Sequence, residues 1–124
     1  MNTKSTILVV DDTPANLQLM SGLLQDDYKV KAATSGEKAL KIAFTDPQPD
    51  LILLDIMMPD IDGYEVCQTL KSDERFAATK IIFLSAKSKK EDIEKGLQMG
   101  ADKYFTKPFS TKQLLQEMVD LLQG

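Results

Sequence analysis

The stretch DLILLDIMMPDIDG, residues 50–63, decides the fold of this chain. Its four consecutive aliphatic residues, 51–54, are typical of a strand that is buried on both faces in a parallel sheet. Asp55 follows directly, and Pro59 to Gly63 then break the pattern into a loop. Because open α/β sheets keep their sites at the carboxyl ends of their strands, Asp55 is a candidate site residue. A lone Asp at such a place is more often a turn residue, so its interpretation depends on the rest of the chain.

The composition limits the classes of protein to consider. A length of 124 residues with 43% hydrophobic content suits one domain, residues 1–124, with its own core. The net charge of -4 argues against direct binding of nucleic acid, because phosphate backbones attract a basic surface. The apolar runs are too short for a signal sequence or a membrane span, so we expect a cytoplasmic protein that does not bind the membrane.

Two residue types limit the chemistry. Cys67 is the single cysteine, which excludes an intrachain disulfide and a cysteine-rich zinc site. Its helical spacing from Val66 and Leu70 predicts a buried thiol. The chain has no histidine, which excludes Ser-His and Cys-His catalysis and any phosphohistidine on this chain.

Strand and helix patterns alternate along the chain. Strands are expected at residues 6–10, 29–33, 51–54, 80–84 and 102–105. Helix starts are expected at Thr13 followed by Pro14, at Thr34 with Glu37, at Gly63, at Ser88 with Glu91, and at Ser110 with Gln113. The helix that starts near Ser88 has few apolar residues, so we expect it to be the most weakly anchored.

Five strands alternating with five helices indicate a doubly wound, flavodoxin-like α/β fold, with a five-stranded parallel sheet and helices on both faces. The strand order 2-1-3-4-5 is the common solution at this size. In that order the first and third strands are neighbours, so Asp11 and Asp12 converge with Asp55. Ser85 and Lys107 then lie at the ends of the next two strands.

Three carboxylates brought this close need a proton or a cation. At about 5 Å and an effective dielectric of 20, each pair repels by roughly 3 kcal/mol. An all-oxygen site of this kind suits Mg²⁺ or Mn²⁺. A carboxylate nucleophile beside a metal, the Ser85 hydroxyl and the Lys107 ammonium is the set that phosphoryl transfer to Asp55 would use. Each of these signals is weak alone, but their placement at one edge of four strands favours a site.

Five sequence pieces carry a resemblance to a known family. They are VVDDTP at 9–14, LLDIMMPDIDG at 53–63, IIFLSA at 81–86, GAD at 100–102 and KPF at 107–109. In this order and spacing they are highly specific. Over nearly its whole length, the sequence resembles a receiver domain of the two-component response regulators, of the chemotaxis-regulator type.

The resemblance implies roles for the acidic residues. Asp55 would be the phosphoacceptor, and Asp12, Asp55 and the main-chain carbonyl of Met57 would ligate Mg²⁺. Asp11 would act through metal-bound water, and Mn²⁺ could replace Mg²⁺. Met57 and Lys87 occupy the two variable positions that flank the phosphoryl group. These residues would affect the lifetime of the phosphorylated state and not the mechanism of phosphoryl transfer.

The resemblance also implies a switch. Ser85 would be the switch hydroxyl, in place of the more frequent Thr, and Tyr104 the rotating aromatic residue. Lys107 would bind the phosphoryl group and precede a cis bond to Pro108. Without this resemblance, Tyr104 would be interpreted as an ordinary aromatic residue of the core.

By the same resemblance, the chain is a signalling module and not an enzyme acting on a separate substrate. Its phosphoryl donor would be a histidine kinase or a phosphotransfer protein. A downstream protein or output domain would read the face formed by the fourth helix, fifth strand and fifth helix. A phosphorylation-dependent homodimer is a further expectation.

Three alternatives compete with this interpretation. A hydrolase of the haloacid-dehalogenase type wants a second acid two residues after the nucleophile, where this chain has Met57. A flavodoxin-like cofactor binder needs a phosphate loop after the first strand, where Asp11 and Asp12 would repel the phosphate. A receiver-like scaffold that is never phosphorylated is disfavoured, because every residue that phosphoryl transfer would use is present.

Overall fold

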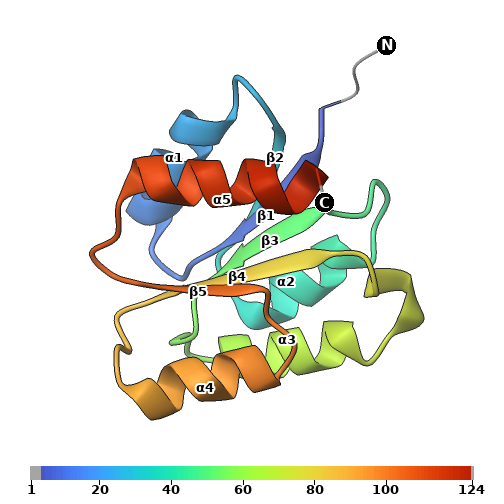
Figure 1. Cartoon of the computed structure of the whole chain (residues 1–124). Coiled ribbons are helices and arrows are strands. Elements are labelled where there is room, and N and C mark those ends of the chain that lie inside the picture. Colours follow the sequence, from blue (N-terminus) through green and yellow to red (C-terminus); the bar gives the residue numbers. More distant parts are fainter. Residues whose placement is uncertain (1–3, 124) are drawn as a thin grey trace.

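The computed structural model describes residues 4–123 and places a parallel sheet between two layers of helices (Figure 1). The strands are β1 (Thr6–Val10), β2 (Lys29–Ala33), β3 (Leu51–Leu54), β4 (Lys80–Ser85) and β5 (Lys103–Thr106). The helices are α1 (Pro14–Leu24), α2 (Gly36–Ala43), α3 (Gly63–Lys71), α4 (Lys90–Gln98) and α5 (Thr111–Gln123), and a 3-10 turn (Glu74–Phe76) precedes β4. Residues 1–3 and 124 of the predicted domain lie outside the described residues.

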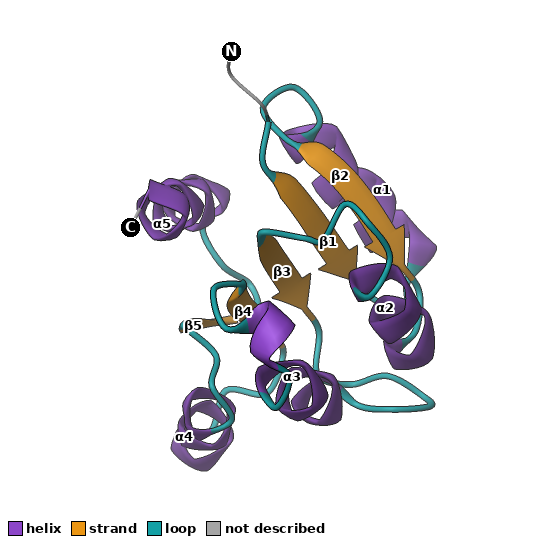
Figure 2. Cartoon of the chain, turned by 90° about the vertical axis from the view of Figure 1, so that its right-hand side faces the viewer, coloured by secondary structure: helices purple, strands orange, loops and turns teal. Residues whose placement is uncertain are grey.

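The five strands lie in the order β2-β1-β3-β4-β5, which can be followed across Figure 2, and all of them are parallel. The predicted fold class and strand order are therefore confirmed. In the register of the sheet, Val10 pairs with Leu54, Leu54 with Phe83, and Ser85 with Thr106. The carboxyl ends of four different strands thus meet at one edge of the sheet.

The core has two halves because successive strand residues point to opposite faces of the sheet. In β1, Ile7 and Val9 pack towards α1 and α5, whereas Leu8 and Val10 pack towards α2 and α3. β1, β3 and β4 are almost wholly buried, and burying one large aliphatic side chain contributes roughly 1.5–3 kcal/mol. Cys67 is fully buried, as predicted, and burial raises the pKa of its thiol to about 11.

Three of the predicted helix starts are confirmed, and one of them is Gly63, the first residue of α3. Thr13 is the N-cap residue of α1 with Pro14 in the first turn, although the Thr13 hydroxyl makes no capping bond. At α5, the Ser110 hydroxyl accepts a hydrogen bond of 3.2 Å from the main-chain N–H of Gln113.

Two other predicted helix starts are wrong. The N-cap of α2 is Ser35, whose hydroxyl accepts from the N–H of Lys38 at 3.2 Å, and not Thr34 paired with Glu37. Thr34 and Ser35 are adjacent hydroxyl residues, so the pattern alone did not distinguish them. α4 is capped by Lys89 without a side-chain bond, and not by Ser88 with Glu91. The loop before α4 is thus one residue longer than predicted, and within it the Lys87 main chain bonds to the side chains of Ser85 and Tyr104.

β5 begins one residue later than predicted. Asp102 precedes it, and the Asp102 carboxylate accepts a hydrogen bond of 2.9 Å from the N–H of Ile81 in β4. The side chain of Asp102 therefore closes the start of the β4–β5 ladder.

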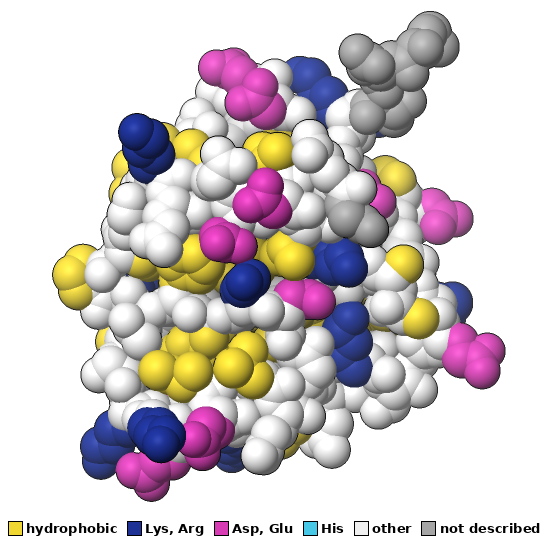
Figure 3. Space-filling view, in the orientation of Figure 1, with side chains coloured by type: hydrophobic (Ala, Val, Ile, Leu, Met, Phe, Trp, Pro, Cys, Tyr) yellow, Lys and Arg dark blue, Asp and Glu magenta, His cyan; other side chains and the backbone are white. Residues whose placement is uncertain are grey.

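Hydrophobic side chains gather on the face that α4, β5 and α5 present in Figure 3. Leu97 of α4 is 45% exposed and Val119 of α5 is 38% exposed. An ion pair of 3.6 Å between Lys103 and Glu117 joins β5 to α5 on the same face. Within residues 4–123, every helix is too short or too polar to cross a membrane.

Candidate functional site

The hydrogen bonds of the sheet continue one residue past the strands. The N–H of Asp55 donates to the carbonyl of Val10 at 3.0 Å, and the N–H of Lys107 donates to the carbonyl of Ser85 at 2.8 Å. Asp11 is held in the same way, because its N–H donates to the carbonyl of Ala33 at 3.1 Å. The backbone of the sheet thus fixes the positions from which these side chains extend.

The three predicted carboxylates come together. Asp11, Asp12 and Asp55 each place an oxygen so that these atoms lie within 4.8 Å of one another. Asp11 is 8% exposed, Asp55 is half-buried and Asp12 is exposed. Burial raises the pKa of Asp55, and the charge of Asp11 adds to this effect, whereas the charge of Lys107 opposes it. The cluster therefore carries a negative charge that is costly to hold without a cation.

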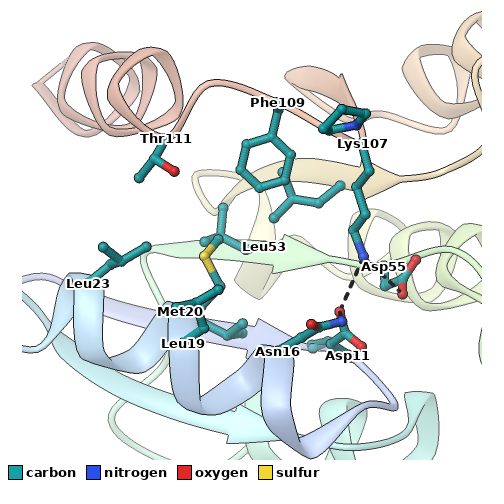
Figure 4. A pocket seen from close by; sticks show the side chains of 14 residues that line it. Asp11, Asn16, Leu19, Met20, Leu23, Leu53, Asp55, Lys107, Phe109 and Thr111 are labelled. Atoms are coloured by element: carbon teal, nitrogen blue, oxygen red, sulfur yellow. Dashed lines mark hydrogen bonds and ion pairs between the residues drawn. The ribbon is translucent and has the colours of Figure 1, made fainter.

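Lys107 reaches the cluster from the loop between β5 and α5 (Figure 4). Its Nζ lies 3.4 Å from Oδ2 of Asp11 and 3.7 Å from Oδ2 of Asp55. The bond between Lys107 and Pro108 is cis, as expected. One ammonium group facing three carboxylates leaves an excess of negative charge, which a divalent cation would neutralise.

Asp11 is already engaged by the start of α1. Its Oδ1 accepts from the N–H of Thr13 at 2.9 Å, and its Oδ2 accepts from the amide of Asn16 at 3.2 Å. Sequence reasoning missed Asn16, for which the only signal was a polar residue in the first turn after Pro14. Both oxygens of the Asp11 carboxylate thus accept hydrogen bonds, whereas the Asp12 side chain is exposed.

The loop after Asp55 is fastened at two points. The N–H of Gly63 donates to the carbonyl of Ile56 at 2.8 Å, and a Cβ on Gly63 would collide with the carbonyl of Asp55. The Asp60 carboxylate accepts from the first N–H groups of α2, those of Gly36 at 3.2 Å and Glu37 at 3.0 Å. Sequence reasoning missed this role of Asp60. The loop that carries the Met57 carbonyl is thereby held against α2.

The remaining predicted residues lie beside the acidic cluster. Ser85 is fully buried, and its Oγ accepts from the N–H of Lys87 at 3.2 Å. Tyr104 is half-buried, and its hydroxyl donates to the Lys87 carbonyl at 2.7 Å. Met57 is 59% exposed and lines a shallow depression together with Asp12 and Lys87.

A cavity of about 320 Å³ leads away from the cluster between α1 and the start of α5. Asp11, Asp55 and Lys107 form its polar end (Figure 4). The rest of its lining is mainly apolar and includes Leu19, Met20, Leu23 and Phe109.

The donor set fits a hard divalent cation. All three side chains offer carboxylate oxygens, which are the ligands that Mg²⁺ and Mn²⁺ prefer. The exposure of Asp12 leaves room for the water molecules that Mg²⁺ usually retains. Fold and site together thus define a doubly wound α/β domain with an acidic centre that could hold a metal ion.

Comparison with known proteins gives the family. The sequence pattern of the response regulator receiver domain matches residues 7–119, and the chain belongs to this family. It is 42% identical over 118 residues to the DNA-binding dual master transcriptional regulator RpaA of Synechocystis, covering 94% of this chain and 48% of RpaA. It is 42% identical over 122 residues to a probable cyclic di-GMP phosphodiesterase of Vibrio cholerae, covering 98% of this chain and 27% of that protein. The chain therefore spans about half the length, or less, of these curated relatives.

Solved structures agree with this assignment. The BeF3-activated receiver domain of DrrB matches with a TM-score of 0.89 and 35% identity, covering 98% of this chain and 100% of that one. The chemotaxis protein CheY4 of Vibrio cholerae matches with a TM-score of 0.88 and 29% identity, covering 96% and 99% of the two chains. Receiver domains are signalling modules of two-component systems, and the acidic cluster of this chain fits the place of phosphorylation in them.

Proposed function

We propose that this receiver domain takes a phosphoryl group onto Asp55 from a phosphohistidine of a histidine kinase or phosphotransfer protein. A carboxylate oxygen of Asp55 attacks phosphorus, the phosphorus–nitrogen bond breaks, and the imidazole leaves with the electron pair and takes up a proton. One observation carries this proposal: the half-buried Asp55 carboxylate lies beside two other carboxylates and 3.7 Å from the Lys107 ammonium. The donor must come from elsewhere, because the chain has no histidine.

Other groups of the site stabilise the charge that develops during transfer. Lys107 neutralises a phosphoryl oxygen, and the Ser85 hydroxyl donates a hydrogen bond to another. Asp12, Asp55 and the Met57 carbonyl would hold Mg²⁺, with Asp11 bonding to its water. When bound, Mg²⁺ neutralises negative charge on the phosphoryl oxygens.

The output of the domain is a shift between two conformers. The face of α4, β5 and α5 would present that shift to a downstream protein or an output domain, and its exposed apolar side chains suit an interface. The same face could form a homodimer after phosphorylation. We infer that the domain works in the cytoplasm, because it belongs to the receiver domains of two-component systems. Its net charge of -4 favours a protein partner over nucleic acid.

Family membership removes the hydrolase and flavodoxin-like alternatives. The scaffold that is never phosphorylated remains the competing function, and a phosphorylation assay separates the two.

We expect the chain to gain one acid-labile phosphoryl group when it is incubated with acetyl phosphate and Mg²⁺. Removing the metal with EDTA should stop the uptake, because the acidic cluster would then repel the donor. Intact-protein mass spectrometry measures the gain in mass. Uptake that continues undiminished in EDTA would contradict the metal assignment, and no uptake at all would support the scaffold.

Substitutions of Asp11 and Asp12 should differ in their effect on Mg²⁺ affinity. We expect Asp12→Ala to weaken binding more than Asp11→Ala, because Asp12 is exposed whereas Asp11 already accepts bonds from Thr13 and Asn16. Isothermal titration of both variants with MgCl₂ gives the two dissociation constants. Equal losses of affinity would remove the distinction between a direct and a water-mediated ligand.

A further inference from the structure

Helix α4 is held to the domain by few buried side chains. The structure describes every residue of α4, and among them only Gly96 is buried. Leu97 is 45% exposed, and Ile93 is half-buried. The position of α4 must therefore depend on a small number of specific contacts.

Tyr64 supplies two of these contacts from the first turn of α3. It is 4% exposed, and its hydroxyl donates a hydrogen bond of 3.0 Å to the main-chain carbonyl of Asp92 in the first turn of α4. Nζ of Lys95, one turn further along α4, lies 4.4 Å from the centre of the Tyr64 ring. Tyr64 thus reaches α4 through both its hydroxyl and its ring face.

Three aromatic rings form a layer beneath α4. Tyr64 packs edge-on against Phe83 with ring centres 5.5 Å apart, and Phe83 packs against Tyr104 at 5.9 Å. Within this aromatic layer of Tyr64, Phe83 and Tyr104, Gly96 rests on the rings of Phe83 and Tyr104. A Cβ added to Gly96 would lie 2.9 Å from Cδ2 of Tyr104 and 3.0 Å from Cδ2 of Phe83. The absence of a side chain at Gly96 is what allows α4 to approach this closely.

The hydroxyls at the two ends of the layer hold the same segment of chain. Tyr104 donates to the carbonyl of Lys87 in the loop before α4, and Tyr64 donates to that of Asp92 within it. Burial raises the pKa of both hydroxyls, that of Tyr64 to about 12. Both therefore stay protonated and able to donate at physiological pH.

We propose that Tyr64 is a positioning residue of the switch, whose hydroxyl fastens the first turn of α4 to α3 and so sets how readily α4 moves. This inference rests on the proposed function, in which α4 shifts after Asp55 is phosphorylated. When Tyr104 changes position, its bond to Lys87 is lost and the Tyr64 bond becomes the remaining hydroxyl anchor of the segment. Tyr64 thereby opposes the shift.

The test is hydrogen exchange of the α4 amides, residues 93–98, in the unphosphorylated protein. Tyr64→Phe removes the hydroxyl and keeps the ring, so exchange should be about threefold to tenfold faster, the range expected for losing one net hydrogen bond. Tyr28→Phe is the matched control, because Tyr28 packs against the opposite half of the core and should leave α4 exchange unchanged. Equal exchange in wild type and Tyr64→Phe would overturn the proposal.

A second variant tests the aromatic layer with the Tyr64 hydroxyl intact. Alanine is the better helix former, so Gly96→Ala should slow α4 exchange if the helix does not rest on the rings. We expect faster exchange instead, because the added methyl group pushes α4 away from Tyr104 and Phe83. Slower exchange would count against the layer, and this result is available even if Tyr64→Phe fails to fold.

Beryllofluoride with Mg²⁺, used as a phosphoryl mimic, then tests the link to switching. In wild type, amide shifts should concentrate in residues 85–107. In Tyr64→Phe they should be smaller in α4, because part of the movement has already occurred. Uptake from acetyl phosphate should be the same in both proteins. A failure of uptake in wild type would refute the proposed function, while unchanged α4 shifts in the variant would refute the role of Tyr64 alone.

Discussion

Asp55→Asn is expected to reduce phosphoryl uptake from acetyl phosphate to below detection. The amide that replaces the carboxylate is not a nucleophile towards phosphorus, and none of its neighbours can substitute. Asp11 is tied to Thr13, Asn16 and Lys107, and Asp12 is exposed away from the Lys107 contact. Intact-protein mass spectrometry of wild type and variant under identical conditions measures the loss. Labelling of the variant at the wild-type rate would refute Asp55 as the acceptor.

This loss must be separated from unfolding. Burial raises the pKa of Asp55, so the folded state holds its proton more tightly than the unfolded state does. The stability that Asp55 contributes therefore falls as the pH rises through the interval between the unfolded and folded pKa values. Asp55→Asn removes this cost, so without Mg²⁺ at pH 7 it should melt at or above the wild-type temperature. Asp26→Asn, which changes an exposed acid, is the matched control and should keep normal uptake.

The double variant Met57→Asn with Lys87→Glu should lose its phosphoryl group about tenfold faster than wild type, if about 1.4 kcal/mol of barrier is involved. Hydrolysis needs a water aligned behind phosphorus, and a side chain that bonds to this water lowers the barrier. Met57 lines the depression beside the site with Lys87, but its apolar side chain does not orient water in this way. The Lys87 ammonium group donates hydrogen bonds and does not accept them.

The rate is measured as the decay of labelled protein after the donor is removed. Lys41→Glu makes the same change of charge on the exposed surface of α2 and should leave the decay unchanged. An unchanged or slower decay in the double variant would contradict this explanation of the lifetime.

The sequence was sufficient to predict the fold because each buried strand ends in a residue that stops its apolar pattern. The aliphatic residues 51–54 followed by Asp55 predicted both the strand and the residue at which it ends. The alternation of strands and helices predicted the order of the strands in the sheet. Since the ends of parallel strands meet at one edge, the convergence of Asp11, Asp55 and Lys107 followed from the topology.

Contacts between segments that are far apart in the sequence could not be predicted in this way. Asp60 bonds to the start of α2, and Tyr64 bonds to α4, but both depend on how two segments distant in sequence approach each other. Local patterns also could not distinguish Ser35 from Thr34 as a cap, because either hydroxyl is suitable until the path of the chain is known. The role of Gly96, which allows α4 to approach two aromatic rings closely, likewise depends on packing that the sequence pattern does not show.

Locating the phosphoryl group tests the role of Asp55 most directly. Reduction of the acetyl phosphate-treated protein with borohydride converts a phosphorylated aspartate to homoserine, and peptide mass spectrometry identifies the residue changed. We expect homoserine at position 55 alone, formed only when Mg²⁺ was present during labelling. Homoserine at position 11 or 12 instead, or a phosphoryl group that stays on the Ser85 hydroxyl, would contradict it.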